Sequence, residues 1–276
     1  MTSGIDYEFL NQLERLYHIP YHRTDLLLEV EQDVYTLLQQ NPDDINGLIV
    51  LLKSQQMQGH AEKARALAHK VWKIGGGISS YMEYVYAELL MSLGMLDMVL
   101  TKLQPRFNEL PSNMAQIHST FTRFALLTGN IPLLEKVLAA KPEFNNPFLQ
   151  EFAATYRRLE YCDHFKNIQR LVSETIKNHR LGFEYILYHD RGFTDLSAIY
   201  YTDIPFSQCA SAAKSLNQKI DGYLASSGVK RLYDYEIKLQ NISEHPEDFQ
   251  IPPAQSTTET TTVSNYESDL AKDWGL

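Results

Sequence analysis

Glycine recurs at a fixed interval in this sequence, and this spacing limits the folds that the chain can adopt. Gly59, Gly94 and Gly129 are separated by 35 residues each, and each follows a mostly apolar segment long enough for a helix. Glycine at this place is a common helix stop, because it adopts the left-handed conformation that closes the last turn. Helix stops at equal spacing predict a chain built from repeated helical hairpins.

The helices before these glycines share one side-chain pattern. We align the segments that begin at Ile45, Ser80, Ala115 and Gln150, whose third, seventh and tenth positions fall on one helix face. These positions are Gly47, Met82, Ile117 and Phe152, then Leu51, Tyr86, Phe121 and Tyr156, then Ser54, Leu89, Phe124 and Leu159. We expect this face to pack inside each hairpin.

A second helix is expected after each turn. These helices cover 61–73, 96–108, 132–140 and 165–178. An earlier hairpin over 5–18 and 24–40 ends at Asn41-Pro42-Asp43-Asp44, which stops one helix and starts the next. Residues 5–179 are therefore predicted to form antiparallel helix pairs with no strand among them.

Two local motifs resemble a known family. Asn41-Pro42-Asp43-Asp44, the turn Gly59-His60-Ala61-Glu62-Lys63-Ala64 and the period near 35 residues resemble the tetratricopeptide repeat family. The consensus is met best over 44–74, and the resemblance covers 5–179. It implies a right-handed solenoid of about five helical hairpins, with a concave surface that binds protein or peptide.

The pattern changes after residue 180. Segments 183–188 and 196–201 are rich in aromatic and β-branched residues and flank the turn Asp190-Arg191-Gly192, which predicts a β-hairpin. An amphipathic helix follows, with its apolar side at Phe206, Cys209, Ala213, Leu216, Ile220 and Tyr223. In the next segment Tyr233, Tyr235, Ile237 and Leu239 alternate with Asp234, Glu236, Lys238 and Gln240, the period of a half-buried strand. We expect a small ββαβ module.

The C-terminal segment has the composition of a disordered tail. Residues 243–276 hold seven acidic residues and one lysine, with the polar run Ser256-Thr257-Thr258-Glu259-Thr260-Thr261-Thr262. Leu270, Trp274 and Leu276 stand together at its end and suggest a docking motif that folds on a partner. The mainly α chain thus divides into a repeat domain (1–180), an α+β module (181–242) and an acidic tail (243–276).

Catalytic and metal-binding patterns are not found in the sequence. Cys162 and Cys209 are too far apart for a CxxC site, and no HExxH or GxSxG motif occurs. We therefore expect no cofactor, no metal and no enzyme activity. The N-terminus lacks a signal-peptide pattern and no long apolar run occurs, so a cytoplasmic protein without a membrane segment is expected.

The resemblance also points to a candidate binding surface. In the family's geometry the ninth position of each first helix tends to face the concave surface, and here it holds Lys53, Glu88, Arg123 and Arg158. Three bases in four predict a surface for an acidic segment of a partner or of this chain's own tail. Neighbouring positions would add aromatic and flexible apolar contacts from Tyr81, Tyr84, Met91, Leu126 and Tyr161.

Three functional hypotheses follow from these patterns. The leading one is a non-enzymatic scaffold, adaptor or chaperone-like assembly factor that binds another protein, with the module closing or dimerising one end. A regulator that contacts nucleic acid is the second, although the net charge of −9 and Glu88 argue against it. The third is an enzyme with its site where module and repeats meet, which a deep pocket holding a histidine or carboxylate would favour.

Overall fold

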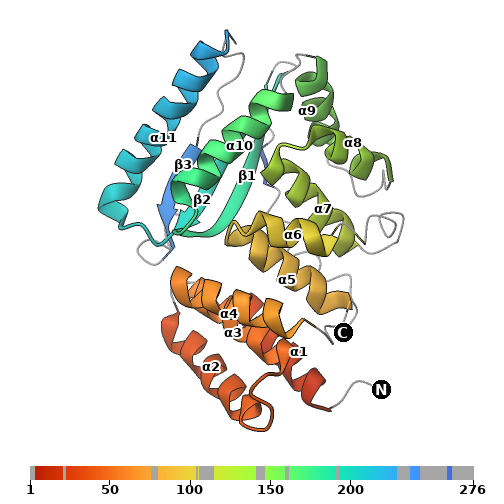
Figure 1. Ribbon diagram of the computed structural model, residues 1–276, viewed down its shortest axis with the longest axis vertical. Helices are drawn as coiled ribbons and strands as arrows, with labels where there is room; N and C mark the ends of the chain where they lie inside the picture. Colours follow the sequence, from red (N-terminus) through yellow and green to blue (C-terminus); the bar gives the residue numbers. More distant parts are fainter. Residues whose placement is uncertain are drawn as a thin grey trace.

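The structure is mainly helical, with a small sheet beside the later helices (Figure 1). It is a computed structural model that describes residues 4–20, 23–75, 80–103, 105, 115–140, 147–158, 162–190, 193–228, 237–242 and 260–262. The helices of the first part are α1 (Gly4–Tyr17), α2 (Thr24–Leu38), α3 (Ile45–Met57), α4 (Ala61–Ile74), α5 (Ser80–Ser92), α6 (Leu96–Leu103), α7 (Ala115–Thr128), α8 (Ile131–Ala140), α9 (Pro147–Arg158) and α10 (Cys162–Ile176). Among the residues described between 44 and 178 there is no strand, as predicted.

The three periodic glycines form one and the same turn. Gly59, Gly94 and Gly129 have φ values of 80°, 70° and 64°. After each of them, the amide of the next residue donates to the carbonyl five residues earlier, as in a Schellman turn. The three bonds are His60 N to Gln55 O at 2.9 Å, Met95 N to Leu90 O at 2.9 Å, and Asn130 N to Ala125 O at 2.8 Å. The predicted repeat is therefore present in the backbone.

The predicted packing stripe is buried. Every described side chain at the third, seventh and tenth positions lies in the core: Met82, Ile117, Phe152, Leu51, Tyr86, Phe121, Ser54, Leu89 and Phe124. Gly47 fits because an added Cβ would lie 2.7 Å from the side chains of Leu38 and Phe9. The side chains of Tyr156 and Leu159 are outside the described set.

The helices contact each other as a stack of pairs. The pairs α1–α2, α3–α4, α5–α6 and α7–α8 are packed internally, and the first helices α1, α3, α5 and α7 also contact one another in that order. Asp44 starts α3 by accepting hydrogen bonds from the amides of Asn46 and Gly47, at 3.0 and 3.2 Å. The right-handed solenoid implied by the family resemblance stays a prediction.

The second part of the chain has the expected ββαβ order. It consists of β1 (Arg180–Asp190), β2 (Phe193–Thr202), α11 (Phe206–Ser226) and β3 (Ile237–Asn241). Strand β2 pairs with β1 in antiparallel and with β3 in parallel orientation. Asn217 of α11 fixes the start of β3, because its side chain donates to the carbonyl of Ile237 at 2.9 Å and accepts from its amide at 3.2 Å.

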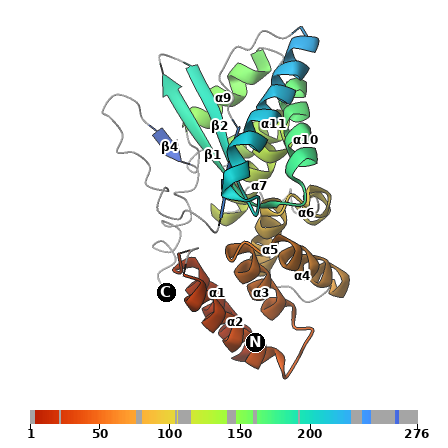
Figure 2. The same ribbon diagram turned by 90° about the vertical axis from the view of Figure 1, so that its left-hand side faces the viewer.

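One face of this sheet lies against helices. Strand residues on that face, such as Phe183, Tyr200 and Leu239, are buried, and the Tyr200 hydroxyl donates to Gln169 Oε1 of α10 at 2.9 Å. Figures 1 and 2 show α10 and α11 together on this side. The alternate residues Tyr201 and Lys238 are partly or fully exposed, so the predicted register of β3 is confirmed for Ile237–Gln240. Residues 233–235 lie outside the described part.

A fourth strand comes from three residues of the tail, for which the sequence predicted no regular structure. Thr260–Thr262 forms β4, which pairs with β1 and gives the sheet order β3-β2-β1-β4 (Figure 2). The polar composition of 243–276 gave no sign of a strand, whereas threonine pairs well on an open strand edge that supplies unpaired backbone groups. The rest of the tail is outside the described residues.

Candidate functional site

The predicted row of ninth positions exists on adjacent helices. Lys53 of α3, Glu88 of α5 and Arg123 of α7 form what we call the charged column, and all three are partly buried. The side chains of Glu88 and Arg123 are each 16% exposed, and Glu88 Oε2 lies 3.8 Å from Arg123 Nη1. The predicted fourth member, Arg158, ends α9, and its side chain is not among those described.

Glu88 is held from two neighbouring positions of α7. The hydroxyl of Thr120 donates to Glu88 Oε1 at 2.8 Å, while Arg123 pairs with the other carboxylate oxygen. A carboxylate that is largely removed from water is stable only when such partners replace its hydration. The centre of the charged column is therefore engaged within the molecule.

Strand β1 covers the Arg123 end of the charged column. The Arg123 guanidinium carbon lies 4.8 Å from the centroid of the Phe183 ring, which is 6% exposed. Arg180, which is 1% exposed, lies 5.0 Å from the same ring and 5.0 Å from the ring of Tyr200. Arg123 is therefore not exposed beside Lys53, and that prediction is wrong. The repeat pattern says which face Arg123 occupies but not which distant segment packs on that face.

The Lys53 end has a different environment. Lys53 Nζ lies 5.5 Å from the ring centroid of Tyr17, a residue of α1 that is 45% exposed. Tyr81 of α5 is partly buried, and its pKa is raised, first by burial and then by the negative charges of Glu88 and Glu14. At this end Lys53 of α3 therefore lies against Tyr17 of α1, and Tyr81 of α5 lies within electrostatic range of one carboxylate from α1 and one from α5.

Three of the predicted contact residues lie in the core instead. Tyr84, Met91 and Leu126 are 1%, 0% and 0% exposed, so they cannot line an open surface. The physical reason is that α5 and α7 are flanked by helices on several sides, so that most of their circumference is buried. Tyr161 and the proposed tail motif of Leu270, Trp274 and Leu276 lie outside the described residues.

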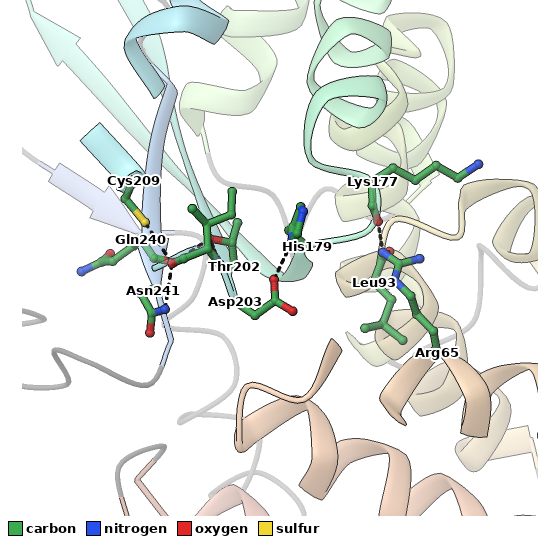
Figure 3. Close-up of polar contacts among 10 residues, drawn as sticks. Arg65, Leu93, Lys177, His179, Thr202, Asp203, Cys209, Gln240 and Asn241 are labelled. Carbon is green, nitrogen blue, oxygen red and sulfur yellow. Dashed lines mark hydrogen bonds and ion pairs between the residues drawn. The ribbon is translucent and has the colours of Figure 1, made fainter. Parts of the chain in front are cut away.

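Polar contacts between distant segments gather near the start of β1, and no sequence pattern indicated them (Figure 3). The Arg65 guanidinium of α4 donates to the carbonyls of Leu93 and Lys177, and Gln56 of α3 donates to the carbonyl of Leu181. Desolvation by burial lowers the pKa of Arg65, and the nearby charge of Arg180 acts in the same direction. No local pattern relates these partners, which lie more than a hundred positions apart in two of the three bonds.

The same junction holds the feature that would come nearest to the enzyme hypothesis. His179 Nδ1 lies 2.7 Å from Asp203 Oδ1, and Figure 3 shows the two side chains facing each other near the base of the sheet. Cys209 is buried and its thiol donates to the carbonyl of Ile204 at 3.4 Å. The His179–Asp203 pair thus connects the turn before β1 to the segment after β2, which is a structural role.

A cleft of about 410 Å³ lies elsewhere, among residues of α4, α5 and α6 and the segments that follow α4 and α6. Its walls include Trp72, Glu83 and Lys102, with Lys102 Nζ 5.6 Å from the Trp72 ring centroid and 3.6 Å from Glu83 Oε1. Neither His179 nor Asp203 lines it. The pocket that the enzyme hypothesis required at the junction is therefore not this cleft.

No family model, curated protein or solved structure matches this chain. Within the described residues, no cluster of three or more metal-ligating side chains occurs. None of the described helices is long and apolar enough to cross a membrane.

Proposed function

We propose that the chain is a non-enzymatic protein-binding scaffold, an adaptor or assembly factor of tetratricopeptide-like architecture. Its binding surface is the Lys53 end of the charged column, with Tyr17 and Tyr81 beside it. The observation that carries this proposal is the contrast along the column: Arg123 lies against the buried ring of Phe183, whereas Lys53 lies against the ring of Tyr17, which is half-exposed.

The residue types suit a protein partner. Tyrosine offers a broad contact area at a low cost in side-chain entropy and is enriched at protein interfaces. A lysine beside it can pair with an acidic group of the partner, and such a pair gains strength when the partner excludes water. The carboxylates of Glu14 and Glu88 near Tyr81 argue against nucleic acid as the ligand, because they would repel phosphate groups.

The test starts with affinity capture from the native host and continues with titration calorimetry on the captured protein. The variant Lys53→Glu combined with Tyr17→Ala should weaken binding at least about tenfold, because it removes the cation and the aromatic surface together. The salt dependence should also decrease, since one ion pair is lost.

The matched control is Lys219→Glu, which makes the same charge change at an exposed position of α11. It should leave affinity unchanged. If the double variant binds as tightly as the parent while circular dichroism shows an intact fold, the Lys53 end is not the binding surface.

A further inference from the structure

The second edge of strand β1 is covered by a piece of the chain's own tail. Along its first edge β1 pairs with β2 from Arg180 to Asp190. Along its second edge it pairs with β4 in antiparallel orientation, with Ile186 opposite Thr262, Leu187 opposite Thr261 and Tyr188 opposite Thr260. The tail therefore contributes a strand to the sheet without being part of the ββαβ module.

The cover is short. Strand β4 has three residues, below the usual strand length of about five to six, so it forms few backbone hydrogen bonds. The edge strand β1 is much longer, at 11 residues. A short strand on a long edge can open locally without loss of the rest of the fold.

The short connection between β3 and β4 favours rapid re-pairing of β4 with β1 after the two strands separate. Residues 243–259 connect β3 and the turn after it to β4. A connection of this length gives the tail strand an effective concentration of the order of millimolar at the β1 edge. A partner segment must compete with β4 for the same edge at this effective concentration. The tail therefore weakens the apparent affinity of the β1 edge for the partner.

We propose that the second edge of β1 is a strand-addition site for an extended segment of a partner protein, and that Thr260–Thr262 is its intramolecular cover. The partner segment binds through its backbone, because an open strand edge offers amides and carbonyls to any extended chain. It is rich in threonine or other β-branched residues and has no proline in the paired stretch, since proline lacks the amide that the edge requires.

This site is separate from the Lys53 end of the charged column, and the two proposals fail independently. The expectation that Lys53, Arg123 and Arg158 hold an acidic segment of a partner or of the tail is a separate prediction, because the described tail residues Thr260–Thr262 pair with the edge of the sheet.

The experiment uses the full-length chain with Thr260, Thr261 and Thr262 each changed to proline. Its matched control changes Ser256, Thr257 and Thr258 to proline, which are three residues that lie four positions earlier in the same tail. The backbone amides of Ile186–Tyr188 should exchange hydrogen about tenfold faster in the first variant than in the control or the parent, as measured by mass spectrometry.

The binding probe is a labelled synthetic peptide with the sequence of residues 256–266, followed by fluorescence anisotropy. It should bind the uncovered variant at least about tenfold more tightly than the control and the parent, and it should restore slow exchange at the β1 edge. Lys53→Glu should change neither result.

Three outcomes would overturn the proposal. Equal exchange in both proline variants would show that Thr260–Thr262 does not cover the edge. Faster exchange without any peptide binding would show that the uncovered edge does not accept a strand. A concentration-dependent dimer of the parent, lost in the first variant, would also overturn it, because the tail would then cover a second copy rather than its own chain.

Discussion

The helical repeats and the ββαβ module differ in how far apart in the chain their partners lie. From α1 to α8, the two helices of a hairpin pack on each other and the first helix of each hairpin packs on that of the next, so the stack is built from near neighbours. In the module, β1 contacts α5, and the bond from Gln56 of α3 to Leu181 joins residues 125 positions apart. The repeats can therefore be recognised from the sequence, whereas the placement of the sheet cannot.

The two regions are nevertheless in contact through side chains. Phe183 of β1 packs against the guanidinium group of Arg123 in α7, Tyr200 of β2 donates to Gln169 of α10, and Gln56 of α3 donates to the carbonyl of Leu181. If these contacts carry the coupling, variants at Phe183 should separate the two regions, while variants inside one turn should weaken the stack alone.

The largest effect is expected inside the repeats, at Gly129. Its φ of 64° is unfavourable for any other residue, and an added Cβ would lie 2.7 Å from the backbone of Lys166 in α10. Gly129→Ala should lower the free energy of unfolding by about 4 kcal/mol, measured by urea denaturation. Gly228→Ala is the control, since Gly228 has a φ of 69° but no atom within 4 Å of the added Cβ, and it should cost about 1 kcal/mol.

The next effect concerns the contact between the two regions. Phe183→Ala removes a buried ring that lies against Arg123 and Arg180, and it should cost about 3 kcal/mol. We also expect separate unfolding of sheet and repeats, seen as non-coincident transitions by near-ultraviolet and far-ultraviolet circular dichroism. Phe206→Ala, at a ring that is 49% exposed, should change stability by less than about 0.5 kcal/mol. A single coincident transition in both variants would contradict this coupling.

A smaller effect with a distinct pH dependence is expected at Tyr86 in the repeats. Its buried hydroxyl donates to the carbonyl of Ala68 at 2.7 Å, and burial raises the pKa of Tyr86 above its usual range. Because the unfolded chain loses this proton first, near pH 10, stability is complete below that pH and falls as the pH rises further. Tyr86→Phe should cost about 1 kcal/mol at pH 7 and should reduce the alkaline loss. If urea titrations show that the free energy of unfolding of Tyr86→Phe falls between pH 9 and 11 as steeply as that of the parent, the prediction is wrong.

The smallest effect is expected at the surface of α10. Arg170 Nη1 lies 2.6 Å from Glu174 Oε1, but the two side chains are 59% and 57% exposed. Water and salt weaken such a pair, so Arg170→Ala should change the free energy of unfolding by no more than about 0.5 kcal/mol. A larger loss in thermal or urea denaturation would show that this face is covered in solution.

Features that depend on local backbone geometry could be predicted from the sequence alone. The left-handed turns at Gly59, Gly94 and Gly129, the buried stripe on each first helix and the alternation of Ile237 and Leu239 in β3 were all predictable. Each follows from the period of a helix or strand, which places side chains on a known face.

Which segment packs on each helix or strand face could be seen only in the tertiary structure. Tyr84, Met91 and Leu126 occupy positions where an open surface was expected, yet neighbouring helices bury them. Phe183 covers Arg123, and Thr260–Thr262 pairs with β1 although its composition indicated disorder. These contacts join segments far apart in the chain, and the periodicity of one segment carries no information about which distant segment will lie against it.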